Sequence, residues 1–88
     1  MNQSILFPDI QSWDEELEAV VFPAQQSGAL IECLVGQSVL EHLSGRSIMT
    51  PQQAVEVFEQ YRFDIEELAE EQIEDEQFNA SGQIVITR

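Results

Sequence analysis

Short apolar runs, separated by polar residues and turn formers, fill the first part of the chain and predict β-strands. The short run Ser4–Phe7 stops at Pro8, as an edge strand before a turn would. Leu17–Ala24 is rich in β-branched and aromatic residues, and the mostly apolar run Ala29–Val35 suits a returning strand, so we predict a hairpin that turns at Gln25–Gly28. The second of these strands has two faces, one of Ile31, Cys33 and Val35 and one of Leu30, Glu32 and Leu34.

From Gln37 onward the apolar spacing changes to that of helices. Val39, Leu40 and Leu43 fit one face of a short helix that ends at Gly45. A second helix has a clear start, because Thr50 suits the N-cap, Pro51 the first helical position and Gln53 the partner position of a capping box.

The apolar stripe of this second helix continues into the acidic stretch from Asp64 to Gln77. Its members are Ala54, Val57, Phe58, Tyr61, Ile65, Leu68, Ala69 and Ile73. Phe63 is out of phase and would project to the acidic side of a continuous helix. We therefore predict two helices with a kink near Arg62–Asp64, where Asp64 caps the new helix, Glu67 completes its capping box and Phe63 packs on Leu68.

A final strand is predicted at Ile84–Thr87. The order β-β-β-α-α-α-β favours an α+β fold, in which a small antiparallel sheet carries its helices on one face. At 88 residues, the chain is expected to form one domain spanning 1–88.

The charge balance narrows the classes of partner. Seventeen acidic residues stand against three arginines, no lysine is present, and the formal net charge is −14. Such a chain repels phosphate, so direct binding to nucleic acid or to anionic membranes is not expected, whereas a basic protein partner is permitted. No apolar run approaches the length of a membrane span, and the N-terminus lacks the positive charge of a signal peptide.

The single cysteine, Cys33, rules out an internal disulfide and a cysteine-based zinc cluster. We expect a reduced, cytoplasmic protein without a cofactor. The sequence also lacks a phosphate-binding glycine loop, a dinucleotide fingerprint and a metal-binding histidine motif, so the expectation leans away from an enzyme.

The acidic stretch allows three interpretations. Glu67, Glu70, Glu71 and Glu74 lie opposite the apolar stripe, as on any solvated helix face. Their like charges at spacings of three and four destabilise the helix, which a basic partner would relieve. Cation binding is the third possibility, although no calcium-loop pattern is present.

Four other residues could contribute to a site. Arg62 suits an intramolecular pair with Asp64, Glu66 or Glu59, or else the binding of an anion or of a partner's carboxylate. Trp13, in a polar segment, suits either a lid over the sheet or an interface contact. Cys33 suits packing within a strand, and His42 suits the C-terminal turn of the short helix.

Several short motifs resemble the domain-of-unknown-function family numbered 1488, whose members are small single-domain bacterial proteins. They are Phe7–Asp9, Trp13-Asp14, Ala19–Ala24, Ile31–Cys33, Phe58–Ala69 and Gly82–Ile86. The resemblance implies an α+β domain in a bacterial cytoplasm and carries over no activity, cofactor or catalytic residue.

Our leading hypothesis is a non-enzymatic interaction or regulatory module that docks a basic partner. The predicted partner-binding residues are Glu67, Glu70, Glu71, Glu74, Arg62 and Trp13. The alternative is a small-ligand or metal-binding site where at least two of Arg62, Trp13, Cys33 and His42 converge. A homodimer through the edge strands Ser4–Phe7 and Ile84–Thr87 is also open.

Overall fold

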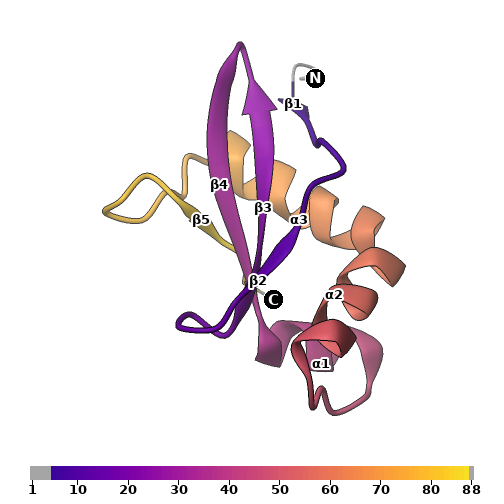
Figure 1. The fold of residues 1–88 in the computed structure, drawn as a ribbon. Coiled ribbons are helices and arrows are strands. Elements are labelled where there is room, and N and C mark those ends of the chain that lie inside the picture. The colour runs from indigo at the N-terminus through magenta and orange to yellow at the C-terminus, as the bar shows by residue number, and fades with distance from the viewer. Residues whose placement is uncertain (1–4, 88) are drawn as a thin grey trace.

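The computed structural model describes residues 5–87 and shows a five-stranded sheet with three helices on one of its faces (Figure 1). The α+β class is therefore confirmed. The elements are β1 (Ile5–Leu6), β2 (Ser12–Asp14), β3 (Ala19–Gln26), β4 (Ala29–Gly36), α1 (Gln37–Ser44), α2 (Pro51–Gln60), α3 (Arg62–Glu74) and β5 (Ile84–Val85).

The hairpin of β3 and β4 forms the centre of the sheet. Its turn has two residues rather than the four we predicted, because Gln25 and Gln26 remain paired with Leu30 and Ala29. The turn residues Ser27 and Gly28 have φ of 52° and 83°. Two positive φ values in succession match the right-handed twist of the flanking strands and keep the hairpin tight.

The N-terminal segment follows the outer edge of β3 as two short strands. β1 and β2 both pair antiparallel to β3, and Trp13, which we placed in a polar segment, lies opposite Val20. Residues 7–11 bulge between the two strands. Within this bulge Pro8 has no N–H to donate to the sheet, and the Ile10 N–H closes a small turn on the Pro8 carbonyl at 2.8 Å.

β5 pairs with β4 in parallel, so the sheet is mixed and not purely antiparallel as predicted. The reason is the connection: three helices carry the chain from the end of β4 back to the start of its neighbour. A crossover of that length is what parallel pairing requires. Ile84 lies opposite Cys33, and the Ile86 N–H donates to Leu34 O at 2.8 Å.

The predicted helix ends are confirmed for α1 and at the start of α2. Gly45 follows α1 with a φ of 71°, and its N–H donates to Glu41 O at 2.8 Å. The Thr50 side chain accepts from the Gln53 N–H at 3.1 Å. The Gln53 side chain accepts in return from the Met49 N–H at 2.7 Å, one residue earlier than in the usual capping box.

The break between α2 and α3 falls at Tyr61, before the position we predicted. Tyr61 has φ −107° and ψ 23°, while its N–H and C=O still bond to Val57 and Ile65 at 3.0 Å. Asp64 therefore lies inside the first turn of α3 and is not its cap. Because the helix restarts so early, Phe63 points away from the core and is 83% exposed, so the predicted packing on Leu68 is wrong.

The core lies between the helices and the inner face of the sheet. Phe22 of β3 meets Phe58 of α2 with ring centroids 5.0 Å apart. The buried apolar residues of this layer are Ile5, Val20, Phe22, Ala24, Cys33, Val35, Leu40, Ile48, Ala54, Val57, Phe58, Ile65, Ala69, Ile73, Ile84 and Ile86. Successive strand residues alternate between faces, so Val21, Pro23 and Glu32 turn to the side that no helix covers.

Candidate interaction surfaces

The outer face of α3 is acidic. Ile65, Ala69 and Ile73 are at most 3% exposed, which confirms that the apolar side of this helix faces the core. The opposite side carries exposed carboxylates at Glu67, Glu71 and Glu74, with Glu70 half-buried. Together with Phe63, four residues before Glu67 on the same helix face, they form what we call the α3 stripe: Phe63, Glu67, Glu70, Glu71 and Glu74.

The carboxylates of the α3 stripe are not neutralised within the described part of the chain. The two ion pairs found among residues 5–87 are both made by Arg62, one with Asp9 and one with Glu66. Neither includes a residue of the stripe. Four close pairs of like charge therefore remain: Glu67 with Glu70, Glu67 with Glu71, Glu70 with Glu74 and Glu71 with Glu74.

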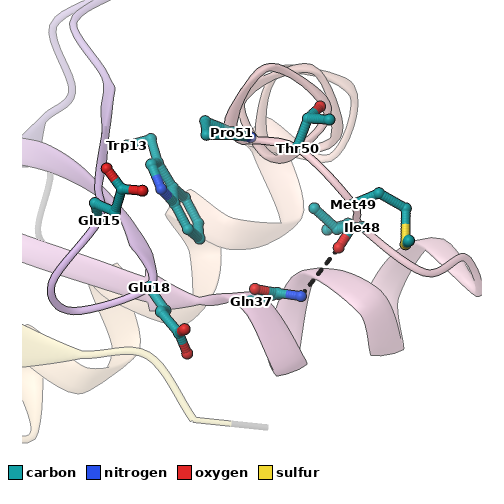
Figure 2. A pocket seen from close by; sticks show the side chains of 8 residues that line it. All are labelled: Trp13, Glu15, Glu18, Gln37, Ile48, Met49, Thr50 and Pro51. Carbon is teal, nitrogen blue, oxygen red and sulfur yellow. Dashed lines mark hydrogen bonds between the residues drawn. The ribbon is translucent and has the colours of Figure 1, made fainter.

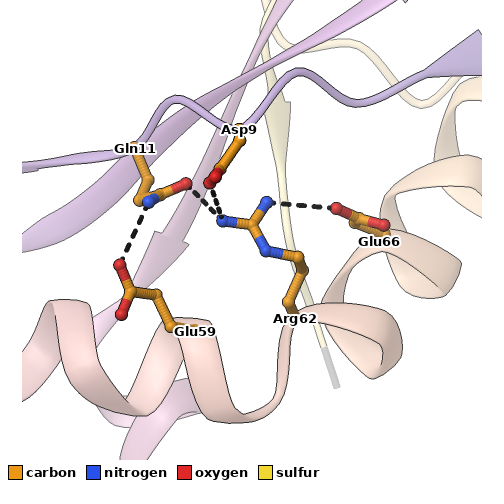
Figure 3. Close-up of polar contacts among 5 residues, drawn as sticks. All are labelled: Asp9, Gln11, Glu59, Arg62 and Glu66. Carbon is orange, nitrogen blue, oxygen red and sulfur yellow. Dashed lines mark hydrogen bonds and ion pairs between the residues drawn. The ribbon is translucent and has the colours of Figure 1, made fainter.

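Arg62 joins the N-terminal bulge to the junction of α2 and α3 (Figure 3). Its guanidinium donates to Asp9 Oδ1 at 2.9 Å, to Glu66 Oε2 at 3.3 Å and to Gln11 Oε1. Its Cζ lies 5.1 Å from the centroid of the Phe58 ring. Gln11 in turn donates to Glu59 Oε2 at 3.2 Å.

The environment of Arg62 confirms the predicted pair with Glu66. Arg62 also forms an ion pair with Asp9, which local spacing could not predict because Asp9 lies 53 residues away in the sequence. The Arg62 side chain is only 19% exposed, and both of its terminal nitrogens donate to side chains of this protein. The arrangement favours holding the fold together over receiving a partner's carboxylate.

Trp13 forms one wall of a small pocket of about 190 Å³ (Figure 2). The indole is half-buried against the core, and the side-chain amide of Gln37 across the pocket donates to Ile48 O at 3.0 Å. The lining residues are Trp13, Glu15, Glu18, Gln37, Ile48, Met49, Thr50 and Pro51. None of them belongs to α3, so the structure separates Trp13 from the α3 stripe.

Glu41 lies beside this pocket and holds the loop between α1 and α2. Its Oε2 accepts the Ile48 N–H at 2.9 Å and the Gln37 amide at 3.2 Å. These hydrogen bonds, that of Ile48 first, lower the pKa of the Glu41 carboxyl from its ordinary value. Within the described part of the chain, Glu41 thus has hydrogen-bond donors for its charge, unlike the carboxylates of the α3 stripe.

Cys33 and His42 lie in different parts of the molecule. Cys33 is fully buried in β4, and this burial, with a smaller contribution from the charge of Glu32, raises the pKa of its thiol to about 12. Such a thiol is a poor nucleophile and metal ligand at neutral pH. His42 is exposed in the last turn of α1.

The four residues of the alternative site hypothesis are not gathered in one pocket. Of the pockets found in the described part of the chain, the one beside Trp13 is lined by none of Arg62, Cys33 and His42. Within residues 5–87, no three His, Cys, Asp or Glu side chains are grouped so that they could hold a metal ion. None of the helices in this range is long and apolar enough to cross a membrane.

Comparison with known proteins identifies the family of this chain. The sequence profile of the family described as "Protein of unknown function (DUF1488)" matches residues 5–86. The chain belongs to the DUF1488 family. The crystal structure of a DUF1488 protein of unknown function from Shewanella loihica PV-4 has 51% sequence identity and a TM-score of 0.95, covering 100% of this chain and 97% of that one.

Two further relatives are nearly as similar in sequence. "Uncharacterized protein YrdB" of Escherichia coli K12 is 43% identical over 82 residues, and that of Shigella flexneri is 42% identical. Each alignment covers 88% of this chain and 93% of the relative. The resemblance drawn from the sequence motifs is thereby confirmed.

Two surface features escaped the sequence reasoning. The predicted packing of Phe63 on Leu68 does not form, whereas its phase in a continuous helix already indicates the acidic side. The second feature is the outward face of the sheet, where Leu30 and Glu32 are exposed and Leu34 is buried. In a two-layer fold this face of β4 faces solvent, and two of these three residues are apolar. Both signals were present in the residue pattern.

Proposed function

We propose that this protein is a non-enzymatic interaction module that docks a basic protein partner through the α3 stripe. The observation that carries the proposal is the exposure of Phe63, which leaves 83% of an aromatic residue in water beside four carboxylates. Aromatic residues surrounded by polar groups are common anchors of protein interfaces.

The energetics of the stripe favour an occupant of positive charge. Each pair of like charges at a spacing of three or four destabilises a helix by roughly 0.2–0.5 kcal/mol, so its four pairs together cost about 1–2 kcal/mol. Lysine or arginine side chains of a partner would remove this cost. Burial of the Phe63 ring would add about 1.5–3 kcal/mol of hydrophobic free energy.

The rest of the molecule supports a binding role over a catalytic one. Arg62 is engaged by Asp9 and Glu66, and the Cys33 thiol is buried and protonated at neutral pH. We place the module in the bacterial cytoplasm, where a lone reduced cysteine is ordinary.

The test is a quantitative pull-down that compares variants of equal charge. The stripe variant replaces Glu67, Glu70, Glu71 and Glu74 by Gln, and a single Phe63→Ala variant tests the anchor. The matched control replaces four other exposed acids by Gln: Glu15, Glu16, Glu18 and Glu56.

We expect the partner to be lost with the stripe variant and weakened by Phe63→Ala, but retained by the matched control at about 0.15 M salt. Circular dichroism checks that each variant is folded. If wild type and stripe variant capture the same proteins equally at that ionic strength, the α3 stripe is not the docking surface.

A further inference from the structure

The face of the sheet opposite the helices is apolar where a solvated face is expected. Leu6 lies opposite Gln25, Gln25 opposite Leu30, and Leu34 opposite Val85, so these side chains share one face. Leu6, Leu30 and Val85 are 61%, 71% and 43% exposed. Most antiparallel sheets with one open face carry polar residues there.

A hollow lies on this open face. It has a volume of about 290 Å³ and is bounded mainly by apolar side chains, including the 63%-exposed Ile10. Its lining residues are Ile10, Ser12, Val21, Phe22, Pro23, Leu30, Ile31 and Glu32. The apolar surface extends past the hollow to Leu6 and Val85, so a small molecule seated in the hollow would leave much of it in water.

Glu32 is the one carboxylate that lines the hollow, and a hydrogen bond orients it. The side-chain amide of Gln83 donates to Glu32 Oε1. Gln83 is itself held by Asn79, which accepts its N–H at 2.8 Å and donates to its side-chain oxygen at 3.0 Å. A carboxylate can accept several hydrogen bonds, so Glu32 retains capacity for a further donor.

We propose that this face docks a segment of a different protein. That segment presents an apolar strip with a single lysine or arginine opposite Glu32. Charge complementarity selects that occupant, because a lone oriented carboxylate within apolar surroundings matches one cation with apolar neighbours. A second copy of this chain is disfavoured, since it brings the same carboxylate and a net charge of −14. This site lies on the face of the sheet that points away from the helices, so it is separate from the α3 stripe and does not depend on the proposed function of that stripe.

The chemistry is tested with hexylammonium, a mimic of a lysine side chain, and with hexanol as its uncharged counterpart. Binding is followed through the amide NMR signals of Val21, Glu32 and Leu34 at 0.15 M salt. We expect hexylammonium to bind more tightly than hexanol, and Glu32→Gln to weaken it by up to about fivefold, the factor that roughly 1 kcal/mol for an exposed ion pair gives. The control Glu16→Gln removes the same charge elsewhere and leaves binding unchanged.

The occupant is tested by a photo-reactive benzoylphenylalanine at position 30 in the native cell. We expect an adduct with a different protein that Glu32→Gln removes, that Glu16→Gln keeps and that persists when the α3 stripe is neutralised. Equal binding of hexylammonium and hexanol, no adduct, or an adduct of twice the chain mass that sedimentation confirms as a dimer would each overturn the proposal.

Discussion

The side-chain amide of Gln72 in α3 pairs with the backbone of β5 as a neighbouring strand would. It donates to Val85 O at 2.9 Å, and its oxygen accepts the Thr87 N–H at 3.0 Å. These are the groups on the outer edge of β5, because Ile86 bonds inward to β4. The edge is thus occupied, which leaves β1 as the edge where the hypothesis of a strand-paired homodimer can still apply.

Replacement of Gln72 tests this edge. We expect Gln72→Leu to lower the free energy of unfolding by about 1–3 kcal/mol, because two backbone groups lose their partner beside a side chain that is 8% exposed. Urea denaturation measures the loss, and hydrogen exchange of the Thr87 amide reports the opened edge. An unchanged exchange rate at Thr87 would show that the amide contributes nothing there.

Arg62 is expected to be the principal tie between the N-terminal bulge and the helices. Arg62→Ala removes its contacts with Asp9, Gln11, Glu66 and the Phe58 ring, and we expect a loss of about 1–3 kcal/mol. Arg62→Lys restores part of it, since an ammonium cannot reproduce the planar fork.

A matched control for Arg62 is Asp9→Asn. Asp9 is 87% exposed, so its share of the ion pair is screened by water and is worth about 0–1 kcal/mol. Thermal or urea unfolding of the three variants gives the ranking. A loss from Asp9→Asn as large as that from Arg62→Ala would show that the Asp9 ion pair alone carries the effect, and that Arg62 is not a tie with several partners.

Cys33 links stability to alkaline pH. Burial raises the pKa of its thiol from 9.0 to about 12, so the folded chain keeps a proton that the unfolded chain loses above 9. The contribution of the Cys33 thiol to the free energy of unfolding is therefore fully present below pH 9. Between pH 9 and 12 the free energy of unfolding falls by up to about 1.4 kcal/mol per pH unit.

Comparison with Cys33→Ala isolates this contribution, because alanine does not titrate. We expect a shallower alkaline decline in the variant, measured by urea unfolding at several pH values. The native thiol is also expected to react with a disulfide reagent at pH 8 only as fast as the protein opens. Parallel pH profiles for both proteins would contradict the burial of the thiol.

Glu41 makes stability depend on pH in the acidic range. Its pKa is lowered in the folded state, so its contribution to stability is present above 4.5 and is lost as pH falls through the folded value. We expect the stability difference between wild type and Glu41→Gln to shrink in that range. Urea unfolding of both proteins at several pH values measures this difference, and a difference that stays constant would contradict the role of the Glu41 hydrogen bonds.

Phe63 and Phe58 form a contrasting pair of aromatic residues. Phe63 is 83% exposed, so Phe63→Ala is expected to change stability by no more than about 0.5 kcal/mol. Phe58 is fully buried against Phe22, and Phe58→Ala is expected to cost about 3–5 kcal/mol. A large loss of stability from Phe63→Ala would assign this residue to the core.

The parts of the fold that the sequence predicted depend on local chemistry. Thr50 and Gln53 mark a helix start through neighbouring atoms, and Gly45 ends α1 through its own backbone freedom. The predicted kink near Arg62–Asp64 lies one to three residues after the observed break at Tyr61, because a break at Tyr61 or at Asp64 leaves the same stripe residues facing the core. Only the position of Phe63 distinguishes these two breaks, and the sequence favours a break at Asp64 because it would let Phe63 pack on Leu68.

Long-range pairings could not be derived in this way. Nothing local joins Arg62 to Asp9, or Gln72 to β5, because those contacts depend on how the helices return across the sheet. The parallel direction of β5 follows from the same crossover. Among the predicted site residues, the exposure of the α3 glutamates can be predicted from helical periodicity alone. The separate locations of Arg62 and Trp13 depend on the three-dimensional fold and cannot be predicted in this way.

Site-specific photo-crosslinking in the native cell tests the role of the α3 stripe most directly. A benzoylphenylalanine is placed at position 63, within the stripe, or at position 78, a partly exposed phenylalanine outside it. We predict an adduct with a basic protein from position 63 alone, lost when Glu67, Glu70, Glu71 and Glu74 become Gln. No adduct from position 63, or one that survives this neutralisation, would contradict the assignment of the α3 stripe as the docking surface.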